Sequence, residues 1–150
     1  MTWHFWEIED HARAALIGLT RKTDWYDALG ALKLGQTGDK KCSLLKEQPS
    51  PLWVEATSNQ PAPLCYLFRG ELRAEGGPDP DVGFIGAQTV KALSEVLRQS
   101  DAFFLGLIQM TEFARANNRD RKGELSIFPP LRVFFEHAAG AEKAVIVLRN

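Results

Sequence analysis

The longest mostly apolar stretch of this sequence covers residues 102–110, which is less than half of what a membrane span requires. A membrane-spanning helix needs about 20 consecutive apolar residues. The chain must therefore bury its hydrophobic residues, 45% of the total, by packing short helices and strands against one another. A length of 150 residues is common for one domain, and we expect residues 1–150 to form a single domain.

The start of the chain carries no basic segment of the kind that begins a secretory signal, and acidic residues follow from Glu7 onward. We therefore expect a cytoplasmic protein. Cys42 and Cys65 belong to no CxxC pair, so both are expected to stay reduced. Eighteen basic residues against nineteen acidic ones leave a net charge of -1. Because nucleic-acid binding depends on neutralising phosphates, this balance predicts no nucleic-acid partner.

The apolar spacing predicts an α+β fold in which helices predominate and a few short strands include one near each end. The aromatic, β-prone segment Trp3–Ile8 predicts the first strand, with one helix over residues 2–19 as the alternative. A helix over residues 11–19 is expected to follow that strand. The apolar residues 144–148 predict a buried last strand.

Caps and breakers predict the elements between the two terminal strands. Asp24 is the expected N-cap of a helix over residues 25–34, and Asp101 is that of a later helix. Pro129 or Pro130 fits the first turn of a last helix that Gly140 ends. Further predictions are a strand or buried turn at 52–54, a single β-bridge at 84–85 and a helix over 87–98.

His4, Glu7 and His11 have a spacing typical of metal ligands if they share one helix. The strand expected at Trp3–Ile8 separates them, so we predict ordinary polar residues and no metal. Glu136 and His137 lie late in the expected last helix, where the helix dipole favours a cationic His. A general base would also need a nucleophile and a pocket, and the sequence indicates neither.

The common phosphate-binding, hydrolase and metalloprotease motifs are missing from the sequence, among them GxxxxGK[ST], GxSxG and HExxH. Cys65 lies in an apolar run, which predicts a buried thiol; Cys42 follows two lysines that would lower its pKa slightly if it were exposed. We therefore predict no catalytic residues and no cofactor.

Two charged segments predict a surface that faces a protein partner. One holds the acidic residues between 71 and 81, whose spacing lacks the register of a calcium loop. The other is the basic cluster of residues 115–122, which has no interleaved aromatic residues for stacking on bases. Interfaces favour aromatic residues and Arg. The predicted binding residues are Trp53, Glu71, Glu75, Asp79, Asp81, Phe84, Arg119 and Arg121.

Three segments resemble the YfbM-like family of small bacterial proteins of unknown function. Residues 26–32 are similar to a Trp-Asp-Ala-Leu-His-type helix of that family, although Tyr26 and Gly30 stand where Trp and His are expected. Residues 64–71 with 83–90 resemble its Gly-Glu turn and the helix after it, and residues 131–148 its closing helix and strand. Residues 102–128 follow the family poorly. The resemblance implies a compact α+β fold and no known reaction.

These observations favour a non-catalytic protein-binding module, and by analogy with other small bacterial proteins an immunity protein that neutralises a toxin. The expected partner is another protein, with no nucleic acid, no membrane, and a monomeric or homodimeric state. The alternative is an enzyme or small-ligand-binding protein whose pocket uses His4, His11, His137 and Glu136. A third hypothesis is self-association through Trp3 and Trp6.

Overall fold

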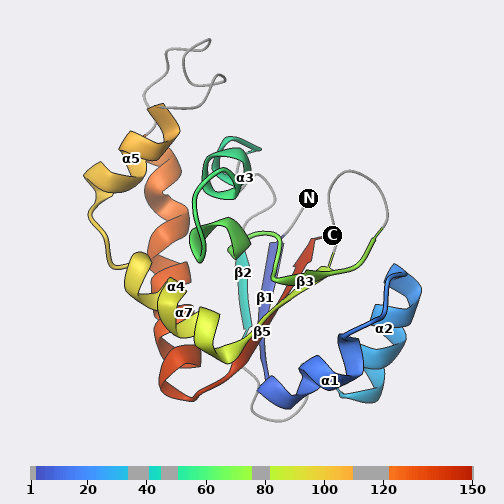
Figure 1. Cartoon of the computed structure of the whole chain (residues 1–150). Helices are drawn as coiled ribbons and strands as arrows, with labels where there is room; N and C mark the ends of the chain where they lie inside the picture. The colour runs from blue at the N-terminus through green and yellow to red at the C-terminus, as the bar shows by residue number, and fades with distance from the viewer. Residues whose placement is uncertain (1–2, 34–40, 45–50, 76–81, 110–121, 150) are drawn as a thin grey trace.

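The structure, a computed structural model, describes residues 3–33, 41–44, 51–75, 82–109 and 122–149. Five antiparallel strands form one sheet in the order β2-β1-β5-β4-β3. Figure 1 shows helices on both sides of it. The predicted α+β class, with strands near both ends of the chain, is confirmed. The strands are β1 (Trp3–Ile8), β2 (Lys41–Leu44), β3 (Leu72–Arg73), β4 (Val82–Ile85) and β5 (Ala144–Arg149).

The two terminal strands lie side by side in the middle of the sheet. β5 pairs with β1 over six residues, from Trp3 opposite Arg149 to Ile8 opposite Ala144. Four consecutive residues of β5, from Ala144 to Val147, are buried, because both faces of this strand are covered. The buried last strand that the sequence predicts is therefore confirmed. The predicted single bridge at 84–85 is wrong, since β4 pairs with β5 along four residues.

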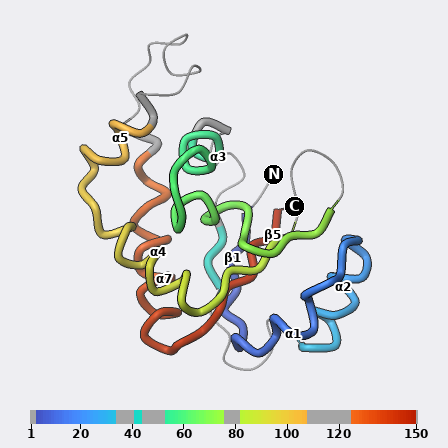
Figure 2. The backbone as a smooth tube through the Cα atoms, in the orientation of Figure 1, coloured from blue at the N-terminus to red at the C-terminus, as the bar shows by residue number. Residues whose placement is uncertain are grey.

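One face of the sheet is covered by α4 (Ala87–Val96) and α7 (Phe128–Gly140), together with α3 (Pro51–Ser58) and α5 (Asp101–Gln109). The opposite face is covered by the short α1 (Arg13–Leu16) and by α2 (Lys22–Ala31), as Figures 1 and 2 show. Three short 3-10 helices complete the described elements. These are η1 (Asp10–Ala12), η2 (Leu64–Tyr66) and η3 (Lys122–Ile127).

Alternation along β1 divides its side chains between the two faces. Trp3 and Phe5 belong to the cluster under α7, whereas Ile8 belongs to the cluster under α1 and α2. Phe5 contacts the rings of Phe68, Phe134 and Phe135 at centroid distances of 6.0 to 6.3 Å. This aromatic packing fixes α7 against the sheet and so positions the surface that α7 forms with β2.

Helix α3 replaces the strand or buried turn that the sequence predicts at residues 52–54. A helix brings Trp53, Ala56 and Thr57 to one side at spacings of three and four, and all three are buried. The Trp53 ring packs on Phe128, with ring centroids 4.7 Å apart. A strand would have placed successive side chains on opposite faces and left fewer of them in contact with this core.

Several helices begin or end at residues other than those predicted. The first helical segment ends at Leu16, because Ile17 is extended and Gly18 has a φ of 86°. Asp24 lies inside the first turn of α2, where it pairs with Arg21, and Arg21 is the N-cap. Before α5, the hydroxyl of Ser100 accepts a hydrogen bond from the backbone N–H of Phe103. Short polar side chains near a helix start compete for this role.

Candidate functional site

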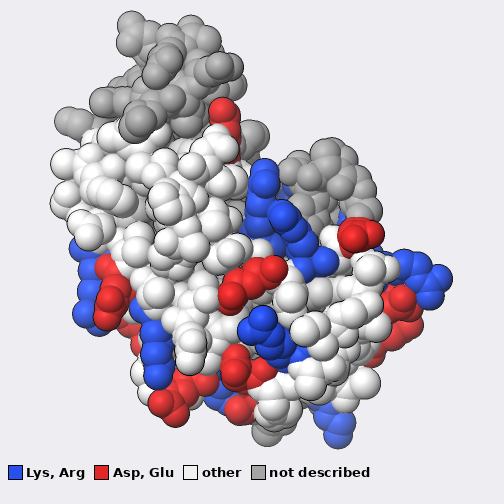
Figure 3. All heavy atoms as spheres, in the orientation of Figure 1, with Lys and Arg blue, Asp and Glu red and all other residues white. Residues whose placement is uncertain are grey.

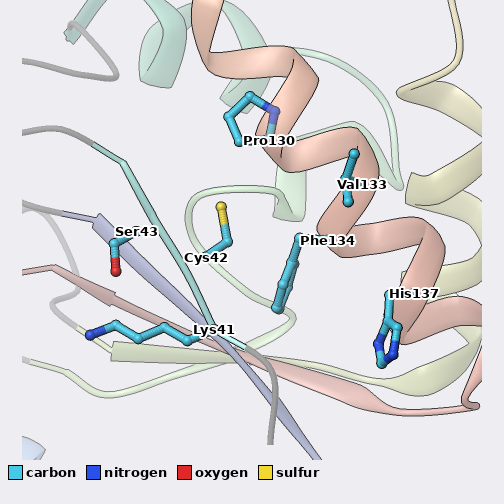
Figure 4. A pocket seen from close by; sticks show the side chains of 7 residues that line it. All are labelled: Lys41, Cys42, Ser43, Pro130, Val133, Phe134 and His137. Atoms are coloured by element: carbon cyan, nitrogen blue, oxygen red, sulfur yellow. The ribbon is translucent and has the colours of Figure 1, made fainter.

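An open hollow lies between the edge strand β2 and helix α7, with a volume of about 440 Å³ (Figure 4). Its walls come from two short stretches of chain. We call this set of residues the β2–α7 surface: Lys41, Cys42, Ser43, Pro130, Val133, Phe134 and His137.

Helix α7 contributes one face to the hollow. Pro130, Val133 and His137 follow one another at spacings of three and four, so they line up along the helix. Phe134 beside them is 5% exposed and packs on Phe5 of β1. Val133, in contrast, is 68% exposed, the largest value among the exposed large hydrophobic residues of the described chain. The hollow therefore has an apolar wall that reaches the surface.

A buried carboxylate lies behind the hollow. Glu7 of β1 is 2% exposed and its Oε1 pairs with Nδ1 of His137, whose side chain is 49% exposed. A buried carboxylate is costly unless it is paired, so this contact explains how β1 tolerates Glu7. The contact engages Nδ1 of His137. The second ring nitrogen, Nε2, is then the atom of His137 that can meet a ligand.

The thiol of Cys42 is a poor nucleophile. Cys42 is 8% exposed, and burial raises its pKa from 9.0 to about 11. Figure 4 shows the ring of Phe134 between Cys42 and His137. A reactive cysteine needs a lowered pKa and an adjacent base. The hollow thus contains a thiol, an imidazole and, behind them, a carboxylate, but the thiol and the imidazole do not form a catalytic pair.

The raised pKa predicts slow chemical modification of Cys42. In a Cys65→Ser variant, Cys42 is the one remaining thiol. At pH 8 we expect it to react with a disulfide reagent about 100-fold more slowly than an unburied cysteine, because two pH units separate its pKa from the ordinary value. The rate should rise about tenfold per pH unit up to about pH 11. Complete modification of the folded variant within seconds at pH 8 would contradict this description.

Two of the predicted binding residues are wrong. Trp53 and Phe84 are both 0% exposed, so neither side chain can contact a partner at the surface. Trp53 packs in the cluster under α7, and Phe84 in the cluster under α1 and α2. Aromatic residues contribute to interfaces and cores alike, and the sequence alone does not separate the two uses.

Of the predicted acidic binding residues, Glu71 has a side chain that bonds to the backbone. Oε1 of Glu71 accepts a hydrogen bond of 2.8 Å from the N–H of Gly86, directly before α4. Asp10 accepts another of 2.8 Å from the N–H of Ala87. Such carboxylates satisfy the unpaired N–H groups of a helix start. Glu75 is exposed, and its own N–H donates to the carbonyl of Thr20. Outside the described residues lie Asp79, Asp81, Arg119 and Arg121.

The histidines considered for a pocket are not brought together. Nδ1 of His4 lies 2.8 Å from the hydroxyl of Ser43, and partial burial, then the charge of Lys41, lower its pKa. His11 is exposed in η1. Glu136 pairs with Arg98 at 3.2 Å, away from the Glu7 contact of His137. Among the described residues, no group of three His, Cys, Asp or Glu side chains could hold a metal ion.

Sequence reasoning considered Glu7 and His137 separately but missed the contact between them. Glu7 and His137 are separated by 130 positions, so no local spacing indicates their contact. Val133 lies outside the buried stripe formed by Leu131, Phe134 and Phe135, which offers a weak signal of a surface role. An apolar residue on the outward face of an amphipathic helix is common. Val133 indicates a candidate binding surface only because it lies beside β2.

The fold and site define a small α+β domain whose antiparallel sheet leaves β2 at an edge beside the last helix. A similar solved structure is YfbM from Escherichia coli, a protein of unknown function, with 17% identity and a TM-score of 0.53 over 99% of this chain and 100% of that chain. The chain thus has a YfbM-like fold, which confirms the resemblance; a likeness at this identity shows the fold alone. No protein-family model and no curated protein matches the chain. In the described part, no helix is long and apolar enough to span a membrane.

Proposed function

We propose that this chain is a non-catalytic protein-binding module whose interface is the β2–α7 surface. One observation carries the proposal: an edge strand lies beside an open hollow whose wall exposes Val133 by 68%. An edge strand presents N–H and C=O groups that can pair with another chain. Within the described ranges, no strand pairs with β2 on the side away from β1.

The polar side chains of the hollow support binding rather than catalysis. The Ser43 hydroxyl bonds to His4, and Nδ1 of His137 is held by Glu7. The Ser43–His4 contact does place a hydroxyl beside an imidazole, as covalent catalysis requires, but His4 is not among the residues that line the hollow. The volume of about 440 Å³ falls within the range of small-molecule sites, so small-ligand binding at His137 is the second candidate.

The charge distribution supports a protein partner rather than a nucleic acid. Figure 3 shows Lys and Arg interspersed with Asp and Glu on the visible face, as a net charge of -1 leads one to expect. A toxin held by an immunity protein remains a candidate by analogy, and a cytoplasmic location belongs to the same proposal. The partner would be recognised by one strand edge and one apolar hollow.

A peptide-display selection tests the proposal with a matched pair of variants. Val133 and Ile17 are both exposed large hydrophobic residues, 68% and 59% exposed, and Ile17 belongs to the α1 side of the sheet. Peptides selected from a random library on the unaltered protein should bind Val133→Glu at least about 10-fold more weakly, a loss of about 1.4 kcal/mol. They should bind Ile17→Glu with unchanged affinity.

Three results would count against this assignment. Selection of no binding peptide, or equal affinity of the selected peptides for all three proteins, would refute the interface. Loss of binding only in Ile17→Glu would move the interface to the α1 side. Circular dichroism of both variants confirms that each is folded before its affinity is interpreted.

A further inference from the structure

We propose that the β2–α7 surface takes up an extended segment of the partner in which apolar and acidic residues alternate, added as a further strand on the outer edge of β2. This inference rests on the proposed function and specifies the chemistry of the partner. It is carried by three independent features of the described residues, which are the free edge, the apolar wall and the sign of the charges near the edge.

The edge determines the conformation of the bound segment. β2 pairs with β1 through four residues, from Lys41 opposite Trp6 to Leu44 opposite Trp3. In an antiparallel pair, alternate residues direct their N–H and C=O groups to the other side of the strand. A segment that satisfies those groups must itself be extended and lie about 4.8 Å from β2. A partner helix could not form these hydrogen bonds, since its own backbone groups are already paired.

The apolar wall of the hollow determines which residues the bound segment carries at every second position. Successive residues of β2 point to opposite faces, and Cys42 points into the cluster under α7. In a strand added beside β2, every second side chain would therefore point to the same face, where the hollow lies. Pro130, Val133 and Phe134 give that hollow apolar walls. Apolar residues at alternate positions of the segment fit this side.

The charges near the edge of β2 determine which residues the bound segment carries at the remaining positions. Lys41 lies on the opposite face of β2, where its Nζ is 4.6 Å from the ring centroid of Trp6. The neighbouring side chains on that face of β1 and β2 are His4, Trp6 and Ser43, and none of them is acidic. None of the described residues that line the hollow is acidic either. Opposite charges on adjacent strands stabilise pairing, so acidic residues fit the alternate positions.

Synthetic labelled peptides test the inference by fluorescence polarisation. The first peptide alternates Val and Glu; the second has the same composition with Val and Glu in two blocks; the third alternates Val and Lys. We expect the first to bind, and the block peptide to bind at least about 10-fold more weakly, because it cannot place Val in the hollow and Glu beside Lys41 together. Methylating alternate amides of the first peptide should abolish its binding.

A charge reversal at Lys41 distinguishes specific strand pairing from nonspecific hydrophobic binding. Lys41→Glu should weaken the binding of the Val–Glu peptide and strengthen that of the Val–Lys peptide. We expect each affinity to change about 3- to 5-fold, as for a cross-strand ion pair. Val133→Glu should weaken both. Equal binding of alternating and block peptides, or a Lys41→Glu variant with unchanged preference, would overturn the inference.

The outcomes also separate this inference from the proposed function. Display peptides that depend on Val133 but are helical or basic would leave the binding module standing and refute the alternating acidic segment. Sedimentation that reveals a dimer broken by Val133→Glu would assign the surface to a second copy of this chain, and would refute it as well. Failure of every peptide, together with no effect of Val133→Glu in the display test, would refute both proposals.

Discussion

Replacing Gly83 with alanine is expected to lower the free energy of unfolding by about 3 kcal/mol or more. A Cβ at this position would lie 2.3 Å from the carbonyl oxygen of Arg69 and 3.0 Å from its carbonyl carbon. Both atoms belong to the backbone, so no side chain can rotate away. β4 cannot shift to make room, because Gly83 is paired with Arg73 on one side and Val147 on the other. Urea unfolding followed by circular dichroism measures the loss.

Gly30→Ala is the matched control for this substitution. Gly30 lies in α2 and a Cβ there would meet no atom within 4 Å. Alanine in a helix is favoured over glycine by about 0.5 to 1 kcal/mol, so this variant should be more stable than the unaltered protein. Equal unfolding midpoints for the two variants would show that β4 does not approach Arg69 as closely as described.

Replacing Arg132 with alanine is expected to cost about 2 to 3 kcal/mol. The guanidinium of Arg132 on α7 donates to the carbonyls of Leu97 and Gln99, at 2.5 and 3.2 Å, and thus holds the turn after α4. It also lies 5.7 and 5.8 Å from the ring centroids of Phe104 and Phe128. The contact with Asp101, at 3.5 Å, is partly exposed and adds little.

Arg132→Lys distinguishes the shape of the guanidinium from its charge. A lysine keeps the positive charge but cannot direct two donors in a fixed fork to the two carbonyl groups. We expect it to recover less than half of the stability lost in Arg132→Ala, measured by the same urea unfolding. Full recovery would mean that charge alone, and not the pair of hydrogen bonds, stabilises the junction of α4, α5 and α7.

The elements that the sequence predicted are those with a strong local signal. Strand β1 has consecutive aromatic residues, β5 a continuous apolar run, and α4 an apolar stripe, and each was placed within a few residues. The prediction of a strand or buried turn at residues 52–54 is wrong because three apolar residues are too few to show a helical or a strand periodicity. Its helix is fixed by the packing of Trp53 on Phe104 and Phe128, which are distant in sequence.

The candidate site was beyond sequence reasoning for a physical reason. Its members come from β2 and α7, with Glu7 of β1 behind them, and the pairing of β1 with both β2 and β5 brings these segments together. Trp53 and Phe84 are predicted at an interface because aromatic residues are common there, yet both side chains are fully buried in the core. Which edge of the sheet is open depends on strand order, and strand order has no local signal.

Hydrogen exchange at the backbone of β2 tests the central claim most directly. The amide exchange rates of Lys41, Cys42 and Ser43 would be measured by NMR with and without a display-selected peptide. Binding on the strand edge should slow the exchange of the outward-facing amides of β2 by at least about 10-fold, while the amides of β3, at the opposite edge, stay unchanged. Unaltered rates throughout β2, with new protection at α1 and α2, would contradict it.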